Sequence, residues 1–273
     1  MAAAELLRAG PAHLVTSDGV ALSSWVHRAP GDAVAIAVLV HGFTASKEDP
    51  TVVGVADALA AAGFDVIAYD GRGHGASGGV CTLGDDERHD VARAVAFARG
   101  FGKPVVAIGA SMGAIAVLRY AVDDPELAGV VTVSCPARWR LHGVRSLLSA
   151  LMTRTAAGRW FLRDRVGVRL ASTWTDAVPP ERLAEGITCP LAIVHGRSDR
   201  WIPCGEAERI HARARGARLD LVSGMGHGFD PGGVESIVDA AHWTLSRSLP
   251  SPAGVGTTTP GPPADRCGRP LPR

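Results

Sequence analysis

The sequence is short of the features that mark several large classes of protein. Its 28 Lys and Arg nearly balance its 27 Asp and Glu, so the charge gives no reason to expect a nucleic-acid partner. The longest strongly apolar run, residues 33–40, is far too short to cross a bilayer, which argues against membrane insertion. The first eight residues include an acid and lack an apolar core, so we expect no secretory signal and a cytoplasmic protein.

Cysteine is scarce, and its five positions show none of the paired spacings of a zinc site. Cys135 and Cys189 flank one segment, which invites a disulfide. The strands predicted below, however, place these residues at opposite edges of a sheet, roughly 15–20 Å apart at about 3.3 Å per residue. A disulfide cannot span that distance. We therefore expect free thiols and no metal site.

What the sequence does contain is a regular alternation of short apolar runs and helical segments. After a hairpin at 12–28 that turns at Asp18-Gly19, strands are predicted at 33–40, 65–69, 105–108, 129–134, 190–194 and 218–222. The helices are predicted at 51–62, 85–100, 114–120, 205–215 and 234–246. This alternation predicts an α/β fold, a mostly parallel sheet with helices on both faces and functional loops at the carboxyl ends of the strands.

Two segments interrupt the alternation. Residues 135–188 are longer than one crossover helix, and we interpret them as a mainly helical cap inserted into a domain of residues 1–248. Between residues 138 and 169 this cap holds eight arginines and a single acid, Asp164. Residues 249–273 are rich in Pro, Gly and Thr, which is typical of a disordered tail.

The central stretch is the strand beginning at Val105, followed by Gly109-Ala110-Ser111-Met112-Gly113 and then by a helix. Gly-x-Ser-x-Gly is short and could arise by chance in a glycine-rich chain. The strand before it and the helix after it make it the pattern of a tight turn that exposes Ser111 above the sheet. Gly109 and Gly113 would remove Cβ atoms where strand and helix crowd each other. Ser111 is therefore the candidate nucleophile.

A serine hydroxyl needs a base before it can attack. Four histidines follow predicted strands and are expected at one edge of the sheet: His41, His74, His195 and His227. Only His227 follows the last strand and has an acid, Asp199, in the loop after the preceding strand. The chain order Ser111, Asp199, His227 is that of nucleophile, orienting acid and base in such sheets. Asp176 and Asp220 are weaker candidates for the acid, and the other three histidines are interpreted as structural.

The loop His41-Gly42-Phe43 follows the first parallel strand. We expect the backbone N–H of Phe43 to point into the site beside that of Met112. Two such donors would form an oxyanion hole, and losing one donor typically costs about 10²–10³ in rate.

Five motifs, in this order, resemble those of the α/β-hydrolase superfamily: His-Gly-Phe, Tyr-Asp-Gly-Arg-Gly-His-Gly-Ala-Ser, Gly-Ala-Ser-Met-Gly, His-Gly-Arg-Ser-Asp and Gly-Met-Gly-His. The likeness covers about residues 12–248 and is greatest to the small esterase, monoacylglycerol-lipase-like and serine-aminopeptidase-like branch. It implies an eight-stranded sheet, no cofactor and two-step acyl transfer to water. It also implies the roles of nucleophile for Ser111, acid for Asp199, base for His227 and oxyanion donors for Phe43 and Met112.

The leading hypothesis is a carboxylesterase-like serine hydrolase that acts on a small-molecule carboxylic ester or thioester. An amidase or peptidase and a carbon–carbon bond hydrolase remain open, because the same triad serves all three. A non-catalytic ligand-binding member of the fold and metal-dependent hydrolysis by the histidines are weaker alternatives. The cap arginines suggest a substrate with an anionic group, although solvated helix faces explain them slightly better. Oligomeric state is left open.

Overall fold

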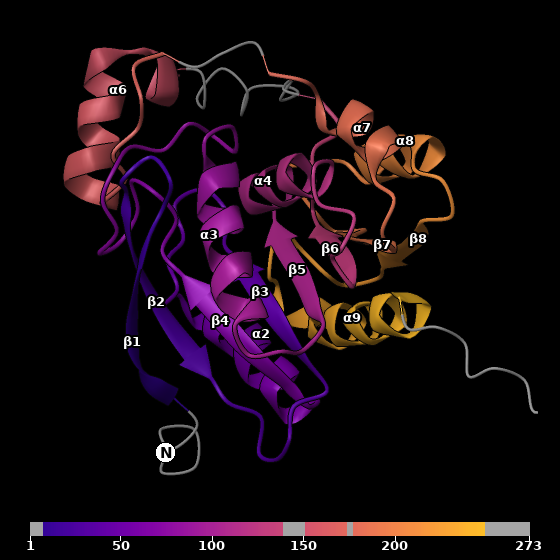
Figure 1. The fold of residues 1–273 in the computed structure, drawn as a ribbon. Helices are drawn as coiled ribbons and strands as arrows, with labels where there is room; N and C mark the ends of the chain where they lie inside the picture. Colours follow the sequence, from indigo (N-terminus) through magenta and orange to yellow (C-terminus); the bar gives the residue numbers. More distant parts are fainter. Residues whose placement is uncertain (1–7, 139–150, 174–176, 249–273) are drawn as a thin grey trace, which may run out of the picture.

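The computed structural model describes residues 8–138, 151–173 and 177–248 (Figure 1). Eight strands form one sheet in the order β1-β2-β4-β3-β5-β6-β7-β8. Their bounds are β1 Arg8–Val15, β2 Ala21–His27, β3 Ala35–Val40, β4 Phe64–Tyr69, β5 Val105–Ala110, β6 Gly129–Val133, β7 Leu191–Gly196 and β8 Arg218–Val222. β2 pairs antiparallel with β1 and with β4, and the other pairs are parallel. The mostly parallel eight-stranded sheet predicted from the sequence is confirmed.

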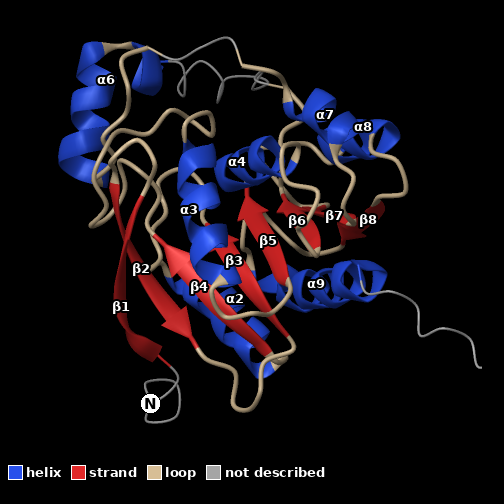
Figure 2. Cartoon of the chain, in the orientation of Figure 1, coloured by secondary structure: helices blue, strands red, loops and turns tan. Residues whose placement is uncertain are grey.

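Helices cover both faces of this sheet (Figure 2). One face is covered by α3 (Glu87–Arg99), α4 (Met112–Ala121) and α8 (Gly205–Arg213). The other is covered by α2 (Pro50–Ala61) and α9 (Val234–Ser248), which follows the short helix η3 (Pro231–Gly233). Every residue of β3, β4, β5 and β7 is therefore buried. This explains why these strands are almost entirely apolar, with Asp65 in β4 and His195 in β7 as the exceptions. The edge strand β8 is only half-buried.

The elements start and end within a few residues of the predicted positions, with one difference that matters for the site. β7 does not end at Val194 but continues through His195 and Gly196. His195 pairs with Leu221 of β8 and is fully buried. The prediction that His195 lies in the loop after its strand is therefore wrong. Pairing with β8 extends the hydrogen-bond ladder past the end of the apolar run.

The predicted cap segment is described in part. Residues 151–154 are helical, as are α6 (Ala156–Phe161), η1 (Leu162–Val166), α7 (Pro180–Leu183) and η2 (Ala184–Gly186). α6 and α7 lie on the side of the carboxyl ends of the parallel strands (Figure 1). The cap is joined to the loop between β4 and α3: Cys81 N–H donates to the Arg169 carbonyl at 2.7 Å, and Arg169 N–H donates to the Gly73 carbonyl at 2.8 Å.

Several predictions fall outside the described residues, namely those for Asp176, Cys267 and the tail at 249–273. The four cysteines that the structure describes, Cys81, Cys135, Cys189 and Cys204, are free thiols as predicted. None of the described helices has the length and apolarity to span a membrane. In the same part of the chain, no three or more His, Cys, Asp or Glu side chains are grouped so that they could hold a metal ion.

Candidate active site

Ser111 occupies the sharp turn between β5 and α4. Its backbone angles, φ 52° and ψ −113°, are those of a strained residue that is not glycine. The turn is tight because a Cβ at Gly109 would overlap the Gly113 carbonyl, and a Cβ at Gly113 would overlap the Val40 carbonyl. The Ser111 N–H donates to the Val133 carbonyl at 2.8 Å, which fixes the turn to β6. Strand, turn and helix therefore hold this serine in one position, as the glycine pattern predicted.

The structure brings Ser111, Asp199 and His227 together at the carboxyl edge of the sheet. The His227 Nε2 atom lies 3.1 Å from Ser111 Oγ, and its Nδ1 atom lies 2.7 Å from Asp199 Oδ2. Both distances are those of hydrogen bonds. If Asp199 is ionised, it accepts from Nδ1–H, and this leaves Nε2 free to take a proton from the serine hydroxyl.

The Asp199 carboxylate is fully buried and its second oxygen is also occupied. Oδ1 accepts from the backbone N–H groups of Trp201 at 2.8 Å and Ile202 at 2.9 Å. Burial raises the pKa of Asp199, but the hydrogen bonds from His227 and from the two backbone groups outweigh it, and the net effect lowers this pKa. The carboxylate is thus held ionised and in a fixed orientation.

The loop after β3 packs directly against the serine turn. A Cβ built at Gly42 would lie 3.3 Å from the Ala110 carbonyl oxygen and 3.4 Å from Ser111 Cβ. Phe43 follows in this loop, and Met112 is the first residue of α4. Both residues thus flank Ser111 in the structure. Whether their N–H groups bind an oxyanion remains a prediction.

The other three histidines considered from the sequence, His41, His74 and His195, make no hydrogen bond to Ser111 among the described residues. The His41 Nδ1 atom lies 2.8 Å from the Gly42 carbonyl, and Nε2 accepts from the Gly71 N–H at 2.9 Å. Burial lowers the pKa of His41 to about 4. Burial likewise lowers the pKa of His74 and of His195. Their contacts fit the structural role predicted for them, because buried neutral rings hold loop backbone in place.

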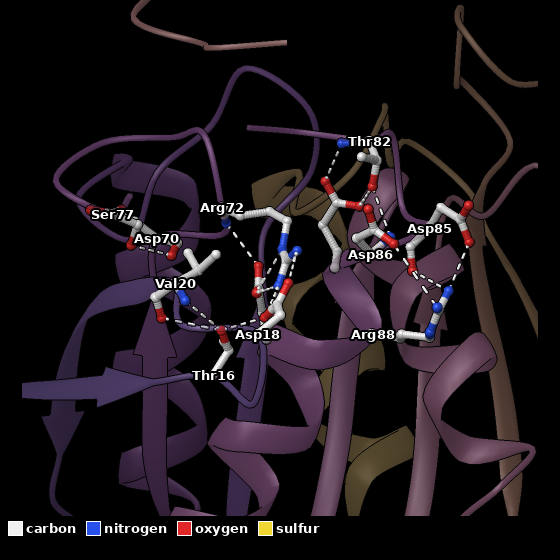
Figure 3. Close-up of polar contacts among 12 residues, drawn as sticks. Thr16, Asp18, Val20, Asp70, Arg72, Ser77, Thr82, Asp85, Asp86 and Arg88 are labelled. Atoms are coloured by element: carbon white, nitrogen blue, oxygen red, sulfur yellow. Dashed lines mark hydrogen bonds and ion pairs between the residues drawn. The ribbon is translucent and has the colours of Figure 1, made fainter. Parts of the chain in front are cut away.

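The loop between β4 and α3, which carries the Asp-Gly-Arg-Gly-His motif, is held by ion pairs of Asp70 and Arg72. Figure 3 shows Arg72 beside Asp18. Arg72 donates through Nε to Asp90 at 2.9 Å and through a terminal nitrogen to Asp18 at 2.8 Å. Asp70 accepts from the Lys47 ammonium and from its backbone N–H, both at 2.9 Å. The polar residues of this motif therefore shape the loop that contacts the cap, which the motif alone does not indicate.

An apolar cluster extends from the serine turn to the cap. Its buried members are Cys81, Met112, Leu162, Val168 and Leu170, and Phe43, Leu83 and Met152 pack against it partly buried. The cluster joins both candidate oxyanion residues to cap side chains. Among its members, Phe43, Leu83 and Met152 keep part of their apolar surface exposed.

The described cap arginines contact protein groups outside the candidate site or are exposed to solvent. Arg138 pairs with Glu181, and the guanidinium of Arg169 donates to the Gly79 and Ser77 carbonyls. Arg154, Arg163 and Arg165 are exposed. This arrangement favours solvated or structural roles over binding of an anionic substrate.

One residue that the sequence did not indicate makes a hydrogen bond to the loop of His227. Ser134 follows β6 directly, is fully buried and has a positive φ of 50°. Its hydroxyl accepts from the backbone N–H of Gly228, the residue after His227, at 3.1 Å. A serine at the end of a predicted strand carries no motif, so the only signal was its place at the same sheet edge.

Comparison with known proteins places these features in a family. A family model described as serine aminopeptidase, S33, matches residues 31–178, which is more than half of the chain. The protein YqkD of Bacillus subtilis (strain 168), described as uncharacterized, is 28% identical over 212 residues, 73% of this chain and 67% of YqkD.

Two solved structures illustrate the likeness of fold. The Pyrococcus furiosus esterase Pf2001 superposes with a TM-score of 0.70 at 22% identity. The superposition covers 88% of this chain and 91% of the Pf2001 chain. The α/β hydrolase GrgF from Penicillium sp. sh18 superposes with a TM-score of 0.67 at 18% identity. The superposition covers 89% of this chain and 99% of the GrgF chain. At these identities the superpositions bear on the fold and not on the substrate.

Proposed function

We propose that this chain, which belongs to the serine aminopeptidase (S33) family of α/β hydrolases, cleaves a carboxylic ester or thioester through an acyl-enzyme on Ser111. The observation that carries the proposal is the unbroken hydrogen-bonded series from Ser111 Oγ through the His227 ring to buried Asp199. A surface serine would need neither the strained turn nor the buried carboxylate behind the histidine.

In the proposed reaction, His227 Nε2 takes the Ser111 proton as Oγ attacks the carbonyl carbon of the substrate. The N–H groups of Phe43 and Met112 stabilise the negative oxygen of the tetrahedral intermediate. His227 then gives its proton to the leaving alcohol or thiol, and the acyl group remains on Ser111. In the second half, His227 takes a proton from a water molecule, which attacks the acyl carbon. His227 then returns this proton to Ser111 Oγ as the bond between Oγ and the acyl carbon breaks and the acid leaves.

Asp199 has two tasks in this scheme. Its hydrogen bond to Nδ1 keeps the neutral ring in the tautomer that presents a bare Nε2 to the serine. Its negative charge also stabilises the imidazolium that forms in each half-reaction. The backbone donors of Trp201 and Ile202 support both tasks, because they keep the carboxylate ionised and in one orientation.

The preference for an ester rests on two supports. We take the partly exposed Phe43, Leu83 and Met152 of the apolar cluster as the surface that an acyl chain would contact. The described cap arginines contact other protein groups or solvent. The similar Pyrococcus furiosus protein is an esterase. A peptide or amide bond is the second candidate, because the matching family model is described as serine aminopeptidase. The same triad can act on both bonds.

The proposal is tested by the hydrolysis of p-nitrophenyl esters of increasing acyl length and of aminoacyl p-nitroanilides. Wild type, Ser111→Ala and the exposed control Ser17→Ala are compared, and a fluorophosphonate label is followed by peptide mapping. We expect ester turnover, label on Ser111, and a loss of about 10⁴–10⁶-fold in kcat for Ser111→Ala only. Faster cleavage of the nitroanilides would favour the amide candidate. Absence of both turnover and label would overturn the hydrolase mechanism.

A further inference from the structure

We propose that Ser134 is a positioning residue that holds the loop of the catalytic histidine against the nucleophile, an inference that rests on the function proposed above. The Ser134 hydroxyl accepts the N–H of Gly228, which is the peptide directly after His227. Fixing that peptide fixes the loop end from which the imidazole reaches Ser111. Ser134 does not touch the reacting atoms, so its effect on the reaction is exerted through His227.

The end of β6 connects all three strands that carry the triad. The Val133 carbonyl accepts from the Ser111 N–H at 2.8 Å, and the Ser134 N–H donates to the Val194 carbonyl of β7 at 3.0 Å. The Ser134 hydroxyl then reaches the loop that follows β8. Two consecutive residues thus bond to the serine turn, to the strand before Asp199 and to the histidine loop.

The backbone conformation of Ser134 indicates that the hydroxyl is placed at a cost. A φ of 50° is strained for any residue with a Cβ. Glycine would adopt the same angles without strain but has no acceptor. The side chain is fully buried, and the Gly228 N–H that it accepts is buried as well. The serine thus supplies what glycine cannot, an acceptor for a buried peptide donor.

His227 depends on such support because its own loop is rich in glycine. Gly226 and Gly228 flank it, and Gly228 has a φ of 66°. On the other side, a Cβ at Gly196 would overlap the Gly226 and Met225 carbonyls, so the loop also packs closely on the end of β7. The hydrogen bond from the Gly228 N–H to the Ser134 hydroxyl joins the residue after His227 to the end of β6. Without it, the ring could move away from Ser111 Oγ while remaining bonded to Asp199.

The test compares Ser134→Ala and Ser134→Gly with Thr132→Val. Thr132 is a matched control on β6, because its hydroxyl is also fully buried but has no hydrogen-bond partner among the described residues. We expect both Ser134 variants to lose about 10- to 100-fold in kcat on the best ester with little change in KM, since misplacement of a catalytic group by about 1 Å costs this much. Thr132→Val should remain within about twofold of wild type.

Three readouts separate positioning from general stability. In the Ser134 variants, backbone amide hydrogen exchange should be faster than in wild type for the peptide that contains Gly228. The exchange rate of the turn at Ser111 should not change. The low-field N–H proton resonance of the His227 ring, assigned by its loss in His227→Ala, should broaden or shift. On a His227→Ala background, Ser134→Ala should cause no further loss of kcat, because the two residues act as one unit.

If Ser134→Ala fails to fold, Ser134→Gly, which relieves the strained φ, still tests the acceptor. Recovery of wild-type kcat by Ser134→Gly would overturn the inference, since it would leave only a backbone role. An additive loss on the His227→Ala background would overturn it as well. These outcomes are distinct from failure of the proposed function, which would show as undiminished turnover in Ser111→Ala.

Discussion

The carboxyl edge of the sheet and the cap differ in how they are held. At the sheet edge, Ser111 and Asp199 are fixed by backbone hydrogen bonds and by glycines that admit no Cβ. The described cap, in contrast, exposes Trp160 by 61% and Phe161 by 45% and places several arginines in solvent. The proposed triad thus lies in the most tightly held part of the described fold, whereas the described cap joins it through a small set of contacts. Substitutions at the edge should therefore have larger effects than substitutions in the cap.

After the loss expected for Ser111→Ala, the largest effect is expected for Asp199→Asn. The amide keeps the size of the side chain, but it can present an N–H toward His227 and hold the ring in the wrong tautomer. We expect kcat for the best ester to fall about 10⁴-fold with little loss of stability. Steady-state kinetics and thermal unfolding measure the two quantities. Asp220→Asn on β8 is the control, and a similar fall in both variants would contradict the role of Asp199.

A smaller effect concerns the dependence of stability on pH. Burial lowers the pKa of His41 to about 4, whereas a histidine in the unfolded chain titrates near 6.5. Between about pH 6.5 and 4 the unfolded state therefore binds a proton that the folded state does not. The free energy of unfolding should fall as the pH is lowered through this window, by up to about 1.4 kcal/mol per pH unit for this ring. His74 and His195 act in the same direction.

Urea unfolding of wild type and His41→Gln between about pH 7 and pH 5 tests this expectation. The substitution removes the titrating ring, so the stability of the variant should depend less steeply on pH, whatever its stability at pH 7. Equal slopes for the two proteins would show that His41 is not held neutral. The carboxyl of Asp199 has a lowered pKa, so its contribution is lost only at lower pH and does not overlap this window.

The smallest effects are expected in the cap, where two arginines of one segment provide a matched pair. Arg169 donates to the Gly79 and Ser77 carbonyls and holds the cap on the loop after β4, whereas Arg163 is exposed. Arg169→Met should lower the free energy of unfolding by about 1–2 kcal/mol, and Arg163→Met should change it by less than about 0.5 kcal/mol. Denaturant titration distinguishes them. An equal change in both would mean that the Arg169 contacts are not stabilising.

Arg163→Met also tests whether the cap binds an anionic substrate. If Arg163 is only a solvated surface residue, the substitution should leave kcat/KM for neutral and for anionic esters of equal length unchanged within about twofold. A selective loss for anionic esters would revive the idea that the cap binds an anion.

The sequence predicts the sheet well because buried parallel strands must be apolar along their whole length, as in β3 and β5. It predicts the positions of Ser111, Asp199 and His227 because turns at strand ends need glycine and chemistry needs particular side chains. It does not predict Ser134, since the positive φ and the bond to Gly228 exist only when the strands are assembled. His195 was misplaced for a related reason, because pairing with β8 extends β7 beyond its apolar residues.

The distance along the chain between the proposed triad residues has a consequence for biogenesis. Ser111 and His227 are 116 residues apart, and the histidine follows β8, the last strand to be made. During synthesis, which adds about 5–20 residues per second from the N-terminus, the serine turn can form on β5 while its partner has yet to be translated. A nascent chain with a folded first half would expose the Ser111 hydroxyl without the His227 base that is proposed to activate it. Catalytic competence would then arrive as one of the last events of folding, and enzyme activity would report completion of the whole sheet.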